Sequence, residues 1–181
     1  MIYPAMVHSS LKVLIDEKRL QQRIQELGQQ ISQDYKGRQL HLICILKGAC
    51  VFLADLIRHL PLDISIDFMA VSSYADNFHS SGEIKIIKDL DCTIQGRDVL
   101  IVEDILDTGL TLDYLVRHLW ARRPGSLRIV ALLTKPARRI KQIDIDYVGF
   151  EIPNGFAVGY GLDYEEKYRN LPHICVIDEV S

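Results

Sequence analysis

The sequence lacks the features that would place a protein in a membrane, outside the cell or on nucleic acid. Its 181 residues contain no long apolar stretch and no charged-then-apolar leader, so we expect neither membrane insertion nor secretion. The formal net charge is only −3, which gives no general attraction to nucleic acid. Basic clusters such as Arg122-Arg123 are short, and they are interpreted as solvated faces or subunit contacts.

The usual metal-binding patterns are also missing. The four cysteines include no Cys-x-x-Cys pair, and the six histidines show no His-Glu-x-x-His spacing, so no zinc site is expected. Cys44 and Cys175 lie inside apolar runs. We therefore expect buried, reduced thiols, as in a cytoplasmic protein.

What the sequence does contain is an alternation of helix and strand patterns. With 48% hydrophobic residues, the chain is expected to form one globular domain with a substantial core. This alternation predicts an α/β fold, with a mainly parallel twisted sheet flanked by helices. Helices are expected from Asp16 to near Gly37, around 53–60 and over 110–122, and strands over 40–46, 64–71, 84–87, 99–102, 127–134, 147–150, 156–160 and 174–177.

Residues 99–111 are the most informative segment. Positions 99–102 are four consecutive apolar residues, as expected of a parallel strand buried on both faces. Glu103 and Asp104 then fall at its exposed end, where carboxylates can accept hydrogen bonds from the vicinal hydroxyls of a ribose. The next turn, Asp107-Thr108-Gly109-Leu110-Thr111, offers backbone N–H groups, a glycine, two hydroxyls and a helix N-terminus, all suited to a phosphate.

A simpler interpretation stays open for each of these residues alone. The acids could be solvated loop residues, and Asp107 or Thr108 could merely cap the following helix. A cap needs one polar residue, whereas this segment has five in nine positions directly after a strand. The whole set therefore predicts a sugar-phosphate site.

The segment resembles the phosphoribosyl-pyrophosphate signature of the type I phosphoribosyltransferases, and further segments resemble the hypoxanthine/guanine branch of that family. Ile45-Leu46-Lys47-Gly48 is similar to the pyrophosphate loop of the family, in which a non-proline cis peptide precedes the lysine. Ala49 stands where many relatives carry a second glycine. Residues 72–82 are similar to the family's mobile flap, with Ser73 and Tyr74 at its start, although an ordinary surface hairpin is the alternative.

The last third of the chain resembles the purine-binding end of these enzymes. Lys135 matches a lysine that donates to the exocyclic oxygen of the base, and would otherwise be a solvated strand end. Phe156 and Ala157 match an aromatic ring that stacks on the purine and a backbone group that reads its edge. Without that match, Phe156 would be a core aromatic. Asp163 and Arg169 match a magnesium-binding carboxylate and a pyrophosphate-contacting arginine.

The resemblance implies the type I phosphoribosyltransferase fold over residues 1–181, with a core over 37–150 and a small hood formed by the N-terminal segment and 151–181. It implies Mg²⁺-dependent reaction of 5-phosphoribosyl-1-pyrophosphate with hypoxanthine or guanine, giving IMP or GMP and pyrophosphate. Glu103, Asp104 and Asp163 are the expected Mg²⁺ ligands, and Asp107 is the expected proton acceptor. A cytoplasmic homodimer or homotetramer that binds small molecules, and neither nucleic acid nor a membrane, is also implied.

Three other interpretations remain open. An RNA-binding transcription attenuator built on the same fold would need a broad basic surface, which the acidic balance does not suggest. A uracil or xanthine phosphoribosyltransferase fits less well with Lys135 and with the segment from Phe156 to Asp163. A generic nucleotide-binding α/β domain would leave the coincidence of the separate matching segments unexplained.

Overall fold

The computed structural model describes residues 11–73 and 84–177, which form two sheets. The larger sheet has six strands in the order β4-β3-β2-β5-β6-β7, and all neighbouring pairs are parallel except β3 with β4. The predicted mainly parallel sheet is therefore confirmed. Its strands are β2 (Gln39–Leu46), β3 (Asp63–Ser73), β4 (Ile84–Lys88), β5 (Asp98–Leu106), β6 (Ser126–Thr134) and β7 (Tyr147–Glu151).

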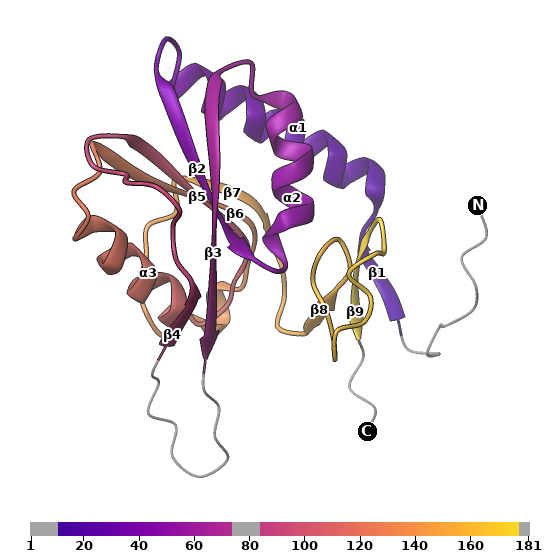
Figure 1. Cartoon of the computed structure of the whole chain (residues 1–181). Helices are drawn as coiled ribbons and strands as arrows, with labels where there is room; N and C mark the ends of the chain where they lie inside the picture. The colour runs from indigo at the N-terminus through magenta and orange to yellow at the C-terminus, as the bar shows by residue number, and fades with distance from the viewer. Residues whose placement is uncertain (1–10, 74–83, 178–181) are drawn as a thin grey trace.

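The smaller sheet joins the beginning and the end of the described chain. It has the order β1-β9-β8, and both of its strand pairs are antiparallel. Figure 1 shows this sheet beyond the arrowhead of β2, to one side of the larger sheet. Its strands are β1 (Leu11–Ile15), β8 (Phe156–Val158) and β9 (Ile174–Ile177).

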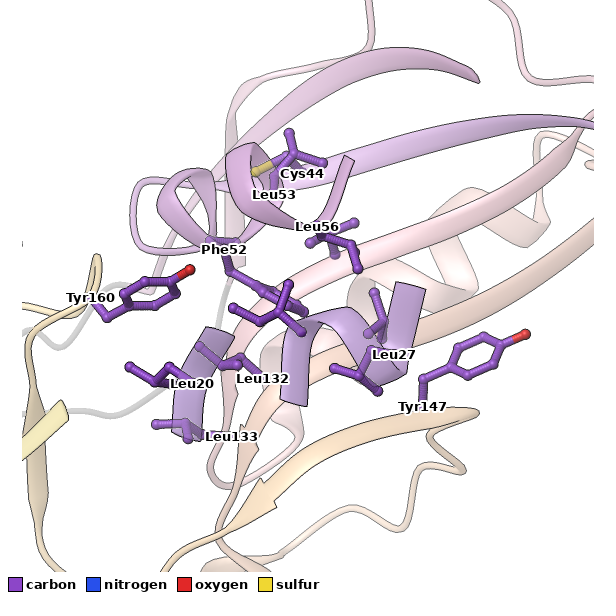
Figure 2. Close-up of a cluster of buried hydrophobic side chains, with 14 of the residues drawn as sticks. Leu20, Leu27, Cys44, Phe52, Leu53, Leu56, Leu132, Leu133, Tyr147 and Tyr160 are labelled. Atoms are coloured by element: carbon purple, nitrogen blue, oxygen red, sulfur yellow. The ribbon is translucent and has the colours of Figure 1, made fainter. Parts of the chain in front are cut away.

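Helices cover both faces of the larger sheet. Helix α1 (Glu17–Asp34) and helix α2 (Ala49–Leu56) pack on one face, while α3 (Leu110–Trp120) packs on the other (Figure 1). The apolar central strands are therefore buried on both faces of the sheet. The Asp16 side chain accepts a 2.9 Å hydrogen bond from the Arg19 N–H and so caps α1, which confirms the expected start of this helix. Figure 2 shows the core under α1 and α2, where Leu20, Leu27 and Phe52 converge on Leu132 of β6.

Several predicted boundaries shift for local reasons. Strand β8 ends at Val158 instead of 160, because Gly159 and Tyr160 have φ angles of +96° and +50°, which no strand accommodates. Helix α2 ends at Leu56 and continues as a single 3₁₀ turn over Ile57–His59. Strand β1 was not among the predicted strands.

The expectation of buried thiols holds for half of the cysteines. Cys44 and Cys175 are buried, whereas Cys50 and Cys92 are exposed, and all four are free. Of the helices within residues 11–73 and 84–177, none combines the length and apolar character needed to span a membrane.

Candidate active site

The acidic pair, Glu103 and Asp104, lies inside strand β5, whereas the sequence suggested that it follows the end of the strand. β5 pairs with β6 as far as Leu106, so Glu103 stands opposite Ala131 within the sheet. The expectation of an exposed strand end is therefore wrong for Glu103, whose side chain is buried, while Asp104 is partly exposed. The apolar run of β5 stops at Val102, but backbone pairing does not depend on side-chain polarity and continues past it.

Burial makes this acidic pair electrostatically unusual. Loss of solvation, with the neighbouring Asp104 charge as a second cause, raises the pKa of Glu103 well above its usual range. Burial likewise raises the pKa of Asp104 to about 6. Among the described residues, Glu103 Oε2 is buried without any hydrogen-bond partner. A buried carboxylate oxygen with no donor is suited to a metal ion or to a substrate hydroxyl.

The loop after β2 brings a lysine and a glycine against this pair. The peptide bond between Leu46 and Lys47 is cis, as the family resemblance predicts. Gly48 packs so closely on Asp104 that a Cβ atom at position 48 would lie 1.5 Å from Asp104 Oδ2. The sequence could not show this contact, because it joins the ends of two separate strands.

The turn after β5 forms the predicted entry to helix α3. Gly109 is the N-cap residue and has a φ of +84°, a conformation that favours glycine. The backbone carbonyl of Lys141 comes so near that a Cβ at position 109 would lie 2.8 Å from it. The first turn of α3, beginning at Leu110, therefore presents its N–H groups beside Thr108 and Thr111, as a phosphate site requires. The Leu110 N–H donates to Thr108 Oγ1 at 3.4 Å.

Asp107 lies between two cationic side chains. Its carboxylate oxygens are 3.7 Å from Lys135 Nζ and 3.1 Å from Arg138 Nε. Lys135 is only 4% exposed, which rules out the simpler interpretation of a solvated strand end. Burial lowers the pKa of Lys135, against the opposing effect of the Asp107 charge. Arg138 was not predicted as a site residue, because the turn after β6 brings it to Asp107 and this turn could not be placed from the sequence.

The loop 163–169 places a carboxylate between the two expected pyrophosphate contacts. Lys47 Nζ is 2.9 Å from Glu166 Oε1, and Arg169 Nη2 is 3.2 Å from Glu166 Oε2. Arg169 also contacts Asp163 Oδ1 at 2.8 Å and donates to the Gly161 carbonyl at 2.8 Å. Glu166 was missed by the sequence reasoning, since one acid in a charged run gives no signal of its own.

One cavity of about 300 Å³ gathers most of the predicted site residues. It lies at the carboxyl ends of β2 and β5, where α/β sheets bind ligands. The predicted residues that line it are Lys47, Gly48, Glu103, Asp104, Asp107, Thr108, Gly109, Thr111, Asp163 and Arg169.

The residues expected at the base lie around this cavity and not in its lining. Lys135 does not line the cavity, but its Nζ lies 3.7 Å from Asp107, which does. Phe156 is 48% exposed, and its ring lies nearly perpendicular to that of Tyr164, with 5.4 Å between the ring centroids. Ala157 is buried beside it in β8. Ser73 ends β3, and Tyr74 lies outside the described residues, so the expected flap stays a prediction.

An acidic pair, a helix N-terminus and two basic side chains meet at the carboxyl end of a parallel sheet. This combination defines an α/β enzyme for a phosphorylated substrate that carries hydroxyl groups. The family model of the phosphoribosyl transferase domain matches residues 11–165, and the chain belongs to that family. The resemblance seen in the sequence is thereby confirmed.

Individual relatives are similar over nearly the whole chain. The hypoxanthine-guanine phosphoribosyltransferase of Bacillus subtilis is 52% identical over 172 residues, which cover 95% of this chain and 96% of that protein. The enzyme of the same name from Mycobacterium avium is 51% identical over 183 residues, covering 98% and 89%. A crystal structure of a hypoxanthine phosphoribosyltransferase from Staphylococcus aureus superimposes with a TM-score of 0.92 at 48% identity, covering 98% of this chain and 97% of that one.

Proposed function

We propose that the protein is a purine salvage enzyme that transfers the phosphoribosyl group of 5-phosphoribosyl-1-pyrophosphate to hypoxanthine or guanine. The products are IMP or GMP and pyrophosphate. The observation that carries the proposal is that the acidic pair, the entry to α3, Lys47 and Arg169 line one and the same cavity. The names of the relatives, which are about half identical in sequence, support the choice of purine.

Each part of the sugar phosphate has a counterpart in this cavity. The N–H groups and hydroxyls from Thr108 to Thr111 would hold the 5′-phosphate, and Glu103 and Asp104 would accept hydrogen bonds from the ribose hydroxyls. Lys47 and Arg169 would bind the departing pyrophosphate, which takes the place of the Glu166 carboxylate between them. Displacement at the anomeric carbon passes through a cationic state, so the protein contributes charge and position and needs no nucleophile of its own.

The residues of the acidic cavity fit a magnesium ion. Glu103, Asp104 and Asp163 offer carboxylate oxygens around one space, and the unpartnered Oε2 of Glu103 lacks only a cation or a donor. When bound, Mg²⁺ would neutralise charge on the pyrophosphate.

At the base, Lys135 would donate to the exocyclic oxygen and Asp107 would accept the proton lost by the purine ring. The exposed face of Phe156 would stack on the purine, and we propose that the small sheet carrying it, with Ala157, is the hood over the base. Cytoplasmic location and assembly as a homodimer or homotetramer stay predictions.

A panel of bases tests the proposed function. Purified protein is incubated with 5-phosphoribosyl-1-pyrophosphate, Mg²⁺ and either hypoxanthine, guanine, xanthine, adenine or uracil, and nucleotides are separated by chromatography. We expect nucleotide from hypoxanthine or guanine and none from adenine or uracil. Nucleotide from uracil alone, or no product with any base, would refute the proposal.

Replacing Lys135 by methionine tests whether this side chain recognises the exocyclic oxygen of the base. The substitution keeps the buried stem but removes the donor, so we expect the KM for hypoxanthine and guanine to rise by about 10-fold to 100-fold while the KM for 5-phosphoribosyl-1-pyrophosphate stays within about 2-fold. Arg138→Met is the matched control, because Arg138 contacts the same carboxylate from the outside. Steady-state kinetics with each substrate varied separately measures both. An effect on the sugar phosphate alone would contradict the role.

Replacing Asp163 by asparagine tests the metal site. Asparagine keeps the shape and an oxygen that can accept from the Glu166 N–H at 2.9 Å, but it loses the charge. We expect the Mg²⁺ concentration for half-maximal activity to rise at least about 10-fold. Glu166→Gln is the control, since Glu166 contacts the same Arg169 without a proposed metal role. A Mg²⁺ titration that is the same for Asp163→Asn and wild type would remove Asp163 from the ligands.

A further inference from the structure

A second cluster of metal-ligating side chains lies away from the active site. His41 of β2, Asp67 of β3 and Cys92, in the segment between β4 and β5, place one ligand atom each within 4.8 Å of one another. His41 lies six residues before Lys47, and six strand residues span about 20 Å, so the cluster belongs to the opposite end of the sheet. The mechanism proposed above uses none of these residues.

The spacing of the three ligand atoms is close to that around a zinc ion. Cys92 Sγ is 3.9 Å from His41 Nε2 and 3.7 Å from Asp67 Oδ2. Zn²⁺ bonds of about 2.3 Å to sulfur and about 2.0 Å to nitrogen place such atoms about 3.5 Å apart in a tetrahedron. The two sulfur distances are therefore within about half an ångström of this geometry. His41 and Asp67, whose ligand atoms lie within 4.8 Å of each other, would have to approach to about 3.3 Å on binding. Cys92 is exposed and can adjust with them.

The two buried ligands are already held in place. His41 is 2% exposed, and its Nδ1 lies 2.7 Å from Ser65 Oγ, which leaves Nε2 directed at Cys92. Asp67 is 3% exposed, and the N–H groups of Phe68 and Asp91 donate to its two oxygens at 2.7 and 2.8 Å. Partners of this kind around a ligand fix its orientation and commonly change metal affinity by about 10-fold to 100-fold.

Solvent can also reach the cluster, which allows a fourth ligand to the metal. His41 lines a cavity of about 570 Å³ at the amino ends of β2, β3 and β5, whose lining includes Arg97 and Gly96. This cavity gives solvent a route to His41, and Cys92 is itself exposed, so a water could supply a fourth ligand. No Cys-x-x-Cys or His-Glu-x-x-His spacing marks the site in the sequence, because its three residues come from three segments that only the sheet brings together.

We propose that His41, Asp67 and Cys92 form a site for a divalent transition metal of the zinc class, with water as the fourth ligand. Binding transfers the Cys92 thiol proton to solvent and forms metal bonds to Sγ, Nε2 and Oδ2. The ion would tie the segment before β5 to strands β2 and β3.

Two cationic side chains near the cluster would weaken metal binding, so removing one of them should raise the metal affinity. Arg97 Nη1 lies 3.7 Å from Cys92 Sγ, and Lys88 Nζ lies 3.6 Å from Asp67 Oδ1. Arg97 is exposed and can swing into solvent, so it competes with the metal for the sulfur. Removing its charge should therefore tighten binding, whereas a purely structural hydrogen-bond cluster would show no such gain.

Cobalt substitution tests the proposal. The full-length protein, freed of metal and kept reduced with a phosphine, is titrated with Co²⁺ while thiolate-to-cobalt absorption is recorded. The carboxylates of the active site cannot give this absorption. We expect a saturable band that equimolar Zn²⁺ abolishes, and that is absent from Cys92→Ser but retained by Cys50→Ser, the other exposed thiol.

Two milder variants sharpen the result. Ser65→Ala removes only the partner of His41 and should weaken Co²⁺ binding by about 10-fold, whereas Arg97→Gln should tighten it several-fold. Zn²⁺ should also raise the thermal unfolding temperature of wild type but not of Cys92→Ser. Absence of the band, or a band that survives in Cys92→Ser, would overturn the proposal.

Discussion

Asp107→Asn is expected to lower kcat by about 100-fold to 10,000-fold, the usual cost of losing one general acid or base. The asparagine fits the same space between Lys135 and Arg138 but cannot accept the purine proton. Because the cavity keeps its shape, the KM for 5-phosphoribosyl-1-pyrophosphate should change much less than kcat. Steady-state rates with hypoxanthine and guanine measure the effect.

Asp113→Asn is the matched control for this prediction. Asp113 lies in the first turn of α3 and pairs with Arg117 at 2.8 Å on the exposed side of the helix, so its loss should leave kcat within about 2-fold. If Asp107→Asn turned over at the wild-type rate with an intact fold, Asp107 would not be the proton acceptor.

Gly48→Ala should lower kcat/KM for 5-phosphoribosyl-1-pyrophosphate by about 100-fold or more. The new Cβ would lie 1.5 Å from Asp104 Oδ2 and 2.7 Å from its Cγ, so the Asp104 carboxylate must leave its position. A displacement of about 1 Å in a substrate-positioning group can cost about 100-fold in rate. The measurement is kcat/KM, with circular dichroism to verify the fold.

Gly37→Ala separates this clash from the general cost of replacing a glycine. Gly37 has a φ of +74°, and a Cβ atom at this position would have no neighbouring atom within 4 Å, so alanine there should lower stability and leave kcat/KM unchanged. An active Gly48→Ala enzyme would mean that Asp104 does not need its present position.

The fold could be predicted wherever a strand carries its own apolar signal. The central strands β2, β5 and β6 each contain an apolar run of four or more residues, and a strand was found at each of the three expected places. The end of β5 was placed too early, because Glu103 is polar yet still pairs within the sheet. Strand β1 escaped prediction because it depends on pairing with β9, a partner more than a hundred residues away in the sequence.

The site could be predicted in outline but not in its charge pairing. The family resemblance located Lys47, Asp107 and Arg169, each of which lies at the common cavity. Their partners Arg138 and Glu166 could not be found, because a salt bridge between distant segments depends on how the chain folds back. The same reason explains why sequence spacing gave no hint of the His41 cluster.

The most direct test is a crystal structure of the protein grown with GMP, Mg²⁺ and pyrophosphate. We expect the 5′-phosphate at the first turn of α3, the ribose hydroxyls on Glu103 and Asp104, and the exocyclic oxygen of guanine within hydrogen-bond distance of Lys135 Nζ. A nucleotide bound in the cavity at the amino ends of β2 and β3, or a phosphate away from the turn at Gly109, would contradict the account.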